Sequence, residues 1–522
     1  MTRCHRTIFA LAALVLAAST PARAQRPGEP VFPFTTDAQY DASRVAPYRG
    51  THDAIYRHID ANLPAHLANI QRWLRQPSIS AQSVGITEMA TMLRDDLRAL
   101  GFQEAEIVPT SGHPGVWGYY NANAPTTLFV YMMYDVQPVE ENWRVPPFAA
   151  ELVETEHGQV VMARGATNQK GPERAFLNAL ASIIAVNGTL PVNLMVLAEG
   201  EEELGSPHYP ELVDRYEARL RTADGVFFPF NAQDPRGGMA MSLGVKGILY
   251  MEMESRGGVW GGPTEAEIHG SNKVIVDSPA WRLTQALASL TSRDGNTIVV
   301  PNYYDGIRPP TLEEQRLINA LAARGGEERQ RAGLGIERFI DGLSGRELLV
   351  RQFYHPTLNI NGLWSGYTGE GSKTILPHRA VAKVDSRLPM GLSSDSALAR
   401  IRKHLVAQGF GDIIIRQLSG YPAGQTSVEA PIIQAALSVY KKYGITPTLS
   451  PRLAGSAPFY QFTERLQLPL LFSGMGHGSG AHAPNEYMVI RPREGSTVAG
   501  LATIEKSYVD LLFALRGTSR GR

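Results

Sequence analysis

The chain has 522 residues, and its 50 basic residues balance its 50 acidic residues, so that its formal net charge is zero. This length predicts two to four domain-sized units. The balanced charge excludes the electrostatic footprint expected of a protein that binds nucleic acid or an anionic membrane surface.

The first element in chain order is a predicted secretory signal, residues 1–24. Arg3 and Arg6 form a basic start, residues 8–18 form an apolar core, and a small-x-small cleavage motif follows. The apolar core is too short to span a bilayer, so we expect an exported protein, periplasmic or secreted, with no membrane attachment after cleavage. Cleavage removes Cys4, the only cysteine, and leaves 47 basic against 50 acidic residues.

The next part of the chain predicts an α/β domain. Residues 25–48 are Pro-rich and weakly patterned, which is typical of an extended lead-in. Strands alternate with helices beyond this segment, and that order predicts a sheet with helices on both faces. The predicted helices are 51–75, 87–100 and 172–186, and the predicted buried strands are 128–134, 192–198, 225–228 and 468–472.

The middle of the chain has a different pattern. Its order of strands and helices predicts a smaller α+β, ferredoxin-like domain inserted into the first. We therefore expect a discontinuous main domain over residues 49–244 and 419–522, and an inserted domain over 245–418. The inserted elements are strands 245–255, 381–388 and 413–418, helices 279–290 and 395–408, and a helical excursion over 310–349.

Three polar clusters directly follow predicted strands of the main domain. Asp135 follows one, the carboxylates from Glu199 to Glu203 follow another, and the stretch from His477 to His482 follows the last. Ligands of open α/β sheets bind beyond the carboxyl ends of the strands. The three clusters therefore predict one site at that edge of the sheet.

Several motifs show that the chain resembles the co-catalytic zinc peptidase family of carnosinases, carboxypeptidase G, aminoacylases and acetylornithine deacylases. The likeness runs from about residue 50 to the C-terminus and is closest to the dipeptidase branch. It implies a three-layer zinc-peptidase-like domain with an inserted ferredoxin-like lid that also dimerises. The motifs are Tyr134-Asp-Val-Gln-Pro138, Arg164-Gly-Ala-Thr167, Lys170-Gly-Pro172, Glu199–Ser206, Gly369-Glu-Gly-Ser-Lys-Thr374, Arg387-Leu-Pro389 and Gly480–Glu486.

The resemblance implies roles for four polar residues of the main domain. Glu202 matches the general base, and Asp135 matches the carboxylate that orients a histidine ligand. Glu203 and His482 match two of the metal ligands. In the family chemistry, water attacks the amide carbonyl between two zinc ions.

Three other ligand positions of the family have changed in this sequence. Met133 stands where the family has its first histidine, Asn168 stands for the bridging aspartate, and Phe230 stands for a terminal aspartate. Asn231 or Asp234 could replace the ligand lost at Phe230. Neutral Asn168 cannot screen two divalent ions as a carboxylate does, so we expect no normal two-zinc centre. What remains is one divalent metal, zinc by resemblance, on Glu203, His482 and Asn168, or no metal at all.

The resemblance also implies a substrate-binding half. Arg387 would hold the free carboxylate of the substrate, because a guanidinium binds a carboxylate with two hydrogen bonds. Gly455 and Ser456 match a turn that contacts substrate, and His269 matches a lid histidine that polarises the scissile carbonyl, often across a homodimer. The implied partners are a small peptide or N-acyl amino acid and a second copy of the chain, with no nucleic acid.

Three functions stay open at this point. The first is hydrolysis of an amide in a small peptide or N-acyl amino acid, with Glu202 as base and a reduced or altered metal centre. The second is a non-catalytic protein that captures peptides in the same cleft. The third is a metal-independent amide hydrolase or acyl transferase that relies on Glu202, Ser456 or a histidine.

Overall fold

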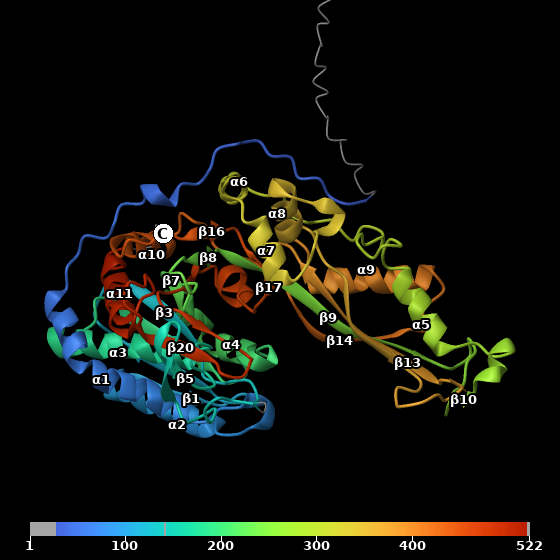
Figure 1. Ribbon diagram of the computed structural model, residues 1–522, viewed down its shortest axis with the longest axis horizontal. Coiled ribbons are helices and arrows are strands. Elements are labelled where there is room, and N and C mark those ends of the chain that lie inside the picture. The colour runs from blue at the N-terminus through green and yellow to red at the C-terminus, as the bar shows by residue number, and fades with distance from the viewer. Residues whose placement is uncertain (1–27, 140–141, 519–522) are drawn as a thin grey trace, which may run out of the picture.

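The computed structural model describes residues 28–139 and 142–518, so the predicted signal sequence lies outside the described residues. The main sheet has six strands in the order β1-β2-β6-β3-β7-β18 (Figure 1). The four strands from β6 to β18 run parallel, and β1 and β2 are added antiparallel at one edge. The strands are β1 (Glu104–Val108), β2 (Gly115–Tyr120), β3 (Thr127–Met133), β6 (Asn193–Glu199), β7 (Gly225–Pro229) and β18 (Leu470–Ser473).

Strand β3 shows why this sheet is buried on both faces. Its even-numbered side chains from Leu128 to Met132 belong to one hydrophobic core, and its odd-numbered side chains from Phe129 to Met133 belong to another. This alternation is the two-residue period of a strand. The three-layer α/β domain that the sequence predicts is confirmed.

Helices supply the outer layers of the main domain. Five of them pack on the first core: α1 (Asp53–Arg75), α2 (Ile86–Ala99), α3 (Lys170–Asn187), α10 (Pro431–Lys442) and α11 (Leu501–Ala514). The opposite core is covered by α4 (Tyr209–Leu220) and by a π-helical turn over Gln461–Arg465. No helix in the described part of the chain is long and apolar enough to cross a membrane.

A second, antiparallel sheet of four strands was not predicted from the sequence. Its order is β19-β20-β5-β4, and it flanks the loop that carries His482. The strands are β4 (Glu151–Thr155), β5 (Gly158–Met162), β19 (Gly478–Ser479) and β20 (Tyr487–Pro492).

The inserted lid is an antiparallel sheet in the order β11-β13-β9-β14, covered on one face by two helices. Strand β9 is long and extends into the main domain, where short strands β15 and β17 pair with it (Figure 1). The lid elements are β9 (Gly244–Arg256), β11 (Asn359–Ser365), β13 (Arg379–Leu388), β14 (Ile414–Tyr421), α5 (Pro279–Ala288) and α9 (Ser394–Ala407). The remaining short strands are β8 (Ala240–Ser242), β10 (Ile268–His269), β12 (Ile375–Leu376), β15 (Gly424–Gln425), β16 (Thr448–Ser450) and β17 (Leu453–Ser456).

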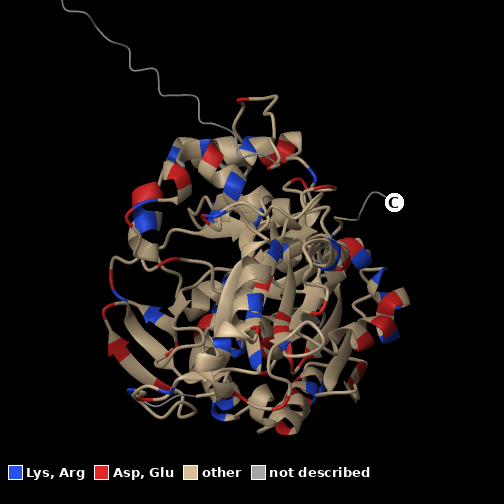
Figure 2. Ribbon diagram, turned by 90° about the vertical axis from the view of Figure 1, so that its right-hand side faces the viewer, with Lys and Arg blue, Asp and Glu red and all other residues tan. Residues whose placement is uncertain are grey.

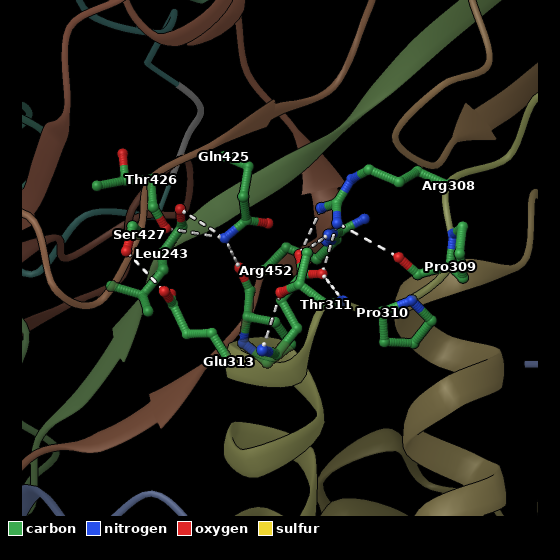
Figure 3. A network of polar contacts seen from close by, with 12 residues as sticks. Leu243, Arg308, Pro309, Pro310, Thr311, Glu313, Gln425, Thr426, Ser427 and Arg452 are labelled. Carbon is green, nitrogen blue, oxygen red and sulfur yellow. Dashed lines mark hydrogen bonds and ion pairs between the residues drawn. The ribbon is translucent and has the colours of Figure 1, made fainter. Parts of the chain in front are cut away.

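The helical excursion forms α6 (Leu312–Arg324), α7 (Glu327–Leu334) and α8 (Gly345–Tyr354). Helix α6 is fastened to the main domain by a polar network at the base of the lid (Figure 3). Glu314 accepts hydrogen bonds from Arg308 at 2.7 Å and from buried Arg452 at 2.5 Å. Glu313 accepts from the hydroxyl of Ser427 at 2.6 Å.

Residues 29–48, the N-terminal strap, run across the outside of these helices and are extended except for a 3-10 turn over Ala42–Arg44 (Figure 1). Phe32 and Phe34 point inward and pack against α6 and α8. Glu29 accepts hydrogen bonds from Arg351 at 2.7 Å and from Thr297 at 2.8 Å. At its other end, the strap donates from the Tyr48 N–H to α10 at 2.8 Å. The strap therefore contacts the lid, the excursion and the main domain.

Candidate active site

The ends of β3 and β6 are tied together by Asp135. Its carboxylate accepts hydrogen bonds from the backbone N–H groups of Glu202 and Glu203, each at 3.1 Å. Burial raises the pKa of Asp135 to about 7. The first two polar clusters predicted from the sequence therefore lie in contact at the ends of β3 and β6.

Asn168, Glu203 and His482 form a cluster of mutual contacts, hereafter the polar triad. Asn168 Nδ2 donates to Glu203 Oε1 at 2.7 Å and lies 3.1 Å from His482 Nε2. His482 Nε2 also lies 3.1 Å from Glu203 Oε2, which accepts from Gln137 Nε2 at 2.8 Å. The hydrogen bond to Glu203 raises the pKa of His482. The three candidate metal ligands therefore lie together, and their polar atoms are engaged in contacts with one another.

Glu486 holds the loop that presents Asn168, a role that the sequence reasoning missed. Its carboxylate accepts from the backbone N–H groups of Gly165, Thr167 and Asn168 at 2.9–3.0 Å. Arg164 donates to it at 3.0 Å, and both members of this ion pair are buried. Glu486 belongs to the same loop as His482, and this proximity in sequence was the available signal.

Met133 and Phe230 are part of the hydrophobic packing. Met133 is 1% exposed and belongs to the core beside α4, while its backbone N–H donates to Glu173 at 2.8 Å. The ring of Phe230 lies 4.4 Å from the ring of Phe472. Neither side chain offers a ligand that suits zinc, because the ligands of zinc are nitrogen, oxygen and thiolate sulfur.

The two candidate replacements for Phe230 make different contacts. Asn231 Nδ2 donates to the Thr167 hydroxyl at 3.3 Å. Asp234 accepts from the backbone N–H groups of Arg236 and Gly238, within its own turn. Asn231 Oδ1 has no hydrogen-bonding partner among the described residues, whereas the Asp234 carboxylate is engaged in its own turn.

These residues do not fit a two-metal centre. Over residues 28–139 and 142–518, no group of three or more His, Cys, Asp or Glu side chains is placed to hold a metal ion. The triad supplies one carboxylate, Glu203, with neutral Asn168 in the bridging position. Two divalent ions roughly 3.5–4 Å apart repel by on the order of 20 kcal/mol at an effective dielectric constant of about 20. One carboxylate does not offset that repulsion.

Glu202 faces a cavity of about 170 Å³ that also touches Asn168, Gly455 and Ser456. Burial and the nearby charge of Glu203 raise the pKa of Glu202 well above its ordinary value. Within the described residues its carboxylate accepts no hydrogen bond. Ser456 donates its hydroxyl hydrogen bond to the Gly247 carbonyl at 2.8 Å, which fixes β17 against β9.

The two lid residues belong to different parts of the lid. Arg387 is half-buried on β13, and its Nε donates to Asp385 at 3.1 Å. His269 is exposed on β10 at the far end of the lid, where its Nδ1 lies 2.7 Å from the Ser271 hydroxyl (Figure 1). His269 and Glu202 are therefore not brought together within one chain.

Comparison with known proteins gives the class of this three-layer domain and its lid: hydrolases that act on peptide bonds. Residues 130–506 match the model of peptidase family M20/M25/M40, and the chain belongs to this family.

Relatives of known identity agree with this assignment. The chain is 26% identical over 457 residues to a Cys-Gly metallodipeptidase of Candida albicans, covering 81% of this chain and 90% of the relative. It is 25% identical over 472 residues to the Beta-Ala-His dipeptidase of Rattus norvegicus, covering 84% and 92%.

Solved structures show the same fold. An M20 family metallo-carboxypeptidase from Sulfolobus solfataricus matches with a TM-score of 0.75 and 32% identity, over 86% of this chain and 99% of that one. Human carnosine dipeptidase 1 matches with a TM-score of 0.69 and 23% identity, over 90% and 99%, and this likeness concerns the fold alone.

Proposed function

We propose that the protein is an exported dipeptidase-like amidohydrolase that cleaves an amide in a small peptide, with a reduced metal centre. The observation that carries the proposal is the Glu202 carboxylate, which faces a cavity beside the polar triad without a hydrogen-bonding partner among the described residues. The printed names of the two curated relatives, both dipeptidases, support a dipeptide substrate.

The proposed reaction uses Glu202 as the base. Glu202 takes a proton from a water molecule whose oxygen attacks the amide carbonyl carbon. The carbon–nitrogen bond then breaks, and Glu202 returns the proton to the leaving amine. Arg387 holds the carboxylate at the C-terminal end of the peptide, for which its guanidinium is suited.

The proposed centre binds at most one divalent ion, zinc by family resemblance. Glu203, His482 and Asn168 are its ligands, and they must first give up the hydrogen bonds that they make with each other. Binding is therefore weaker than in a site with three carboxylates, and no step of the reaction depends on it.

The proposed assembly is a homodimer formed through the lid. His269 belongs to β10 at the far end of the lid from the main domain, so it reaches a substrate bound there only when a second copy presents it. Export rests on the N-terminal sequence, where a basic start, an apolar core and a cleavage motif follow one another.

The decisive experiment measures metal and turnover on the mature protein. Bound metal is determined by elemental analysis, and a dipeptide panel is assayed with and without chelator. We expect measurable turnover that is lost in Glu202→Gln and kept in the matched control Glu328→Gln, because Glu328 is exposed on α7.

Peptide binding without turnover under every metal supplied would overturn this proposal. It would indicate the peptide-capturing protein instead, a function that the mutual hydrogen bonds of the polar triad favour.

A further inference from the structure

The cavity in front of Glu202 has two unlike walls. One wall carries the polar groups of Glu202 and Asn168, and the other is built from Phe228, Phe459 and Phe472. The three rings pack on one another, with centroids 5.0 Å apart for Phe228 and Phe472 and 5.3 Å apart for Phe459 and Phe472. Packed rings of this kind form a firm apolar surface.

The replaced metal-ligand positions contribute to this apolar wall. Met133 lines the cavity directly, and Phe230 supports Phe472 with a ring contact of 4.4 Å. The same two residues that remove metal ligands thus bring an apolar surface up to Glu202. The apolar wall makes the cavity suitable for a hydrocarbon side chain rather than for a metal ion.

The volume of the cavity limits the size of that group. An apolar protein cavity of about 150 Å³ is known to bind benzene. A cavity of about 170 Å³ therefore accommodates a side chain between leucine and phenylalanine in size. Gly455 and Ser456, which the resemblance assigns to substrate contact, also line it.

We propose that this cavity binds an apolar side chain on the N-terminal residue of the substrate. This inference rests on the proposed function, in which Arg387 takes the C-terminal carboxylate and Glu202 stands at the scissile amide. Glu202 lines the cavity and Arg387 does not, so the side chain that enters it belongs to the residue on the opposite side of the amide from the carboxylate. The substrate class is a small peptide that begins with a leucine- to phenylalanine-sized apolar residue.

The proposal is tested by measuring peptide affinity instead of turnover. A failure of the cavity assignment can then be told apart from a failure of the proposed hydrolysis. Isothermal calorimetry on the mature protein compares Leu-Gly, Phe-Gly, Gly-Leu and Gly-Gly, using Glu202→Gln if the wild type cleaves them. We expect Leu-Gly and Phe-Gly to bind roughly 10- to 100-fold more tightly than Gly-Gly, from the apolar surface that they bury. Gly-Leu should show no comparable gain.

Two variants locate the effect in the cavity. Gly455 lines it, and a Cβ built on Gly455 meets no atom within 4 Å, so Gly455→Val adds a side chain at the cavity wall without a clash at its Cβ. We expect this variant to bind Leu-Gly no better than Gly-Gly. Leu453→Ala, at a residue 44% exposed on the cavity wall, should shift the preference towards Phe-Gly. The matched control is Gly333→Val on α7, where a Cβ also meets nothing within 4 Å.

Equal binding of Leu-Gly and Gly-Gly, a preference for Gly-Leu, or no binding of any peptide would overturn the inference. So would an unchanged preference in Gly455→Val once circular dichroism has shown that the variant is folded. A leucine preference without turnover under any metal contradicts only the hydrolysis. Turnover with equal binding contradicts only the cavity assignment.

Discussion

At the residue scale, hydrogen-bond donors surround the carboxylate of Glu203 in the polar triad. A metal ion would bind the oxygen of a side chain at position 168. In this structure Asn168 instead directs its side-chain N–H group at Glu203 and donates to it at 2.7 Å. Gln137 and His482 satisfy the other oxygen of that carboxylate. Hydrogen-bond donors thus compensate the buried carboxylate, as a buried charge requires.

This arrangement predicts that metal affinity can be restored. Met133→His, Asn168→Asp and Phe230→Asp together replace a thioether, a neutral amide and a phenyl ring with ligands that zinc accepts. We expect zinc binding at least 100-fold tighter than in the wild type, measured by calorimetric titration.

Phe230 packs against Phe472, so replacing it affects folding. If the triple variant does not fold, the double variant Met133→His and Asn168→Asp is titrated instead. A folded triple variant with wild-type zinc affinity would show that these three positions do not surround one site.

A second residue-scale prediction concerns Glu314. Burial alone would raise the pKa of Glu314, but hydrogen bonds from Arg308 and the charge of Arg452 outweigh it and lower the pKa. Glu314→Gln leaves Arg452 buried without its carboxylate, and we expect a loss of about 3–5 kcal/mol in the free energy of unfolding. Urea titration of the variant against wild type measures this loss.

The pH dependence gives an independent check on Glu314. A carboxylate with a lowered pKa stabilises the fold above its unfolded pKa, and that stabilisation is lost as the pH falls towards the folded value. The difference between wild type and Glu314→Gln should therefore be full at neutral pH and shrink below about pH 4.5. A difference that does not change with pH would contradict the role given to this carboxylate.

The sequence predicts part of the site for a clear physical reason. Asp135, Glu202 and Glu203 follow buried strands, and parallel strand ends meet at one edge of a sheet. The roles of Glu486 and Gln137 were not predictable in this way. Glu486 accepts hydrogen bonds from backbone N–H groups, which leave no mark on the choice of side chain at the donor positions. Gln137 reaches Glu203 only because the fold brings the two loops together.

At the element scale, long buried strands and amphipathic helices were predictable, whereas short antiparallel strands were not. The predicted helix 395–408 is found as α9 (Ser394–Ala407), with its boundaries shifted by one residue. The four-stranded sheet was not predicted, because β19 has only two residues and β4 is mostly exposed, so neither strand has an apolar pattern that indicates a strand. Such strands depend on partners that lie far away in sequence.

The N-terminal strap leads to an element-scale prediction. Phe32 and Phe34 alternate with exposed neighbours and pack against α6 and α8. Replacing both with alanine should lower the free energy of unfolding by about 2 kcal/mol, since each ring is partly buried. Limited proteolysis should then cut the excursion, residues 310–354, faster than in wild type.

Val31→Ala is the matched control for the strap, because Val31 lies on the same segment and is 63% exposed. Equal proteolysis of the double variant and this control would mean that the strap does not stabilise the excursion.

At the scale of the whole molecule, the lid sheet ends in two edge strands, β11 and β14. Strand β11 lies at the edge of the lid sheet and exposes Ile360, Leu363 and Trp364. An edge strand with exposed apolar residues is a ready surface for a second chain. Basic and acidic residues are interspersed over the elements seen in Figure 2, so charge does not single out another face there.

The homodimer proposal therefore predicts that Leu363→Glu yields a monomer, as measured by light scattering after size exclusion. The control Leu334→Glu changes a residue of α7 that is 61% exposed and should remain dimeric. A wild type that is monomeric at micromolar concentration would contradict the proposal, and would leave His269 without a substrate to reach.

The strap also determines an order of events during synthesis. Its residues leave the ribosome early, but their partners come much later: Thr35 hydrogen-bonds to Gln315, and Gln434 donates to Tyr40. Closing loops of 280 and 394 residues requires nearly the whole chain to be present. The first described segment to be made is therefore among the last to find its place, and a truncated translation product lacks the helices that would hold it.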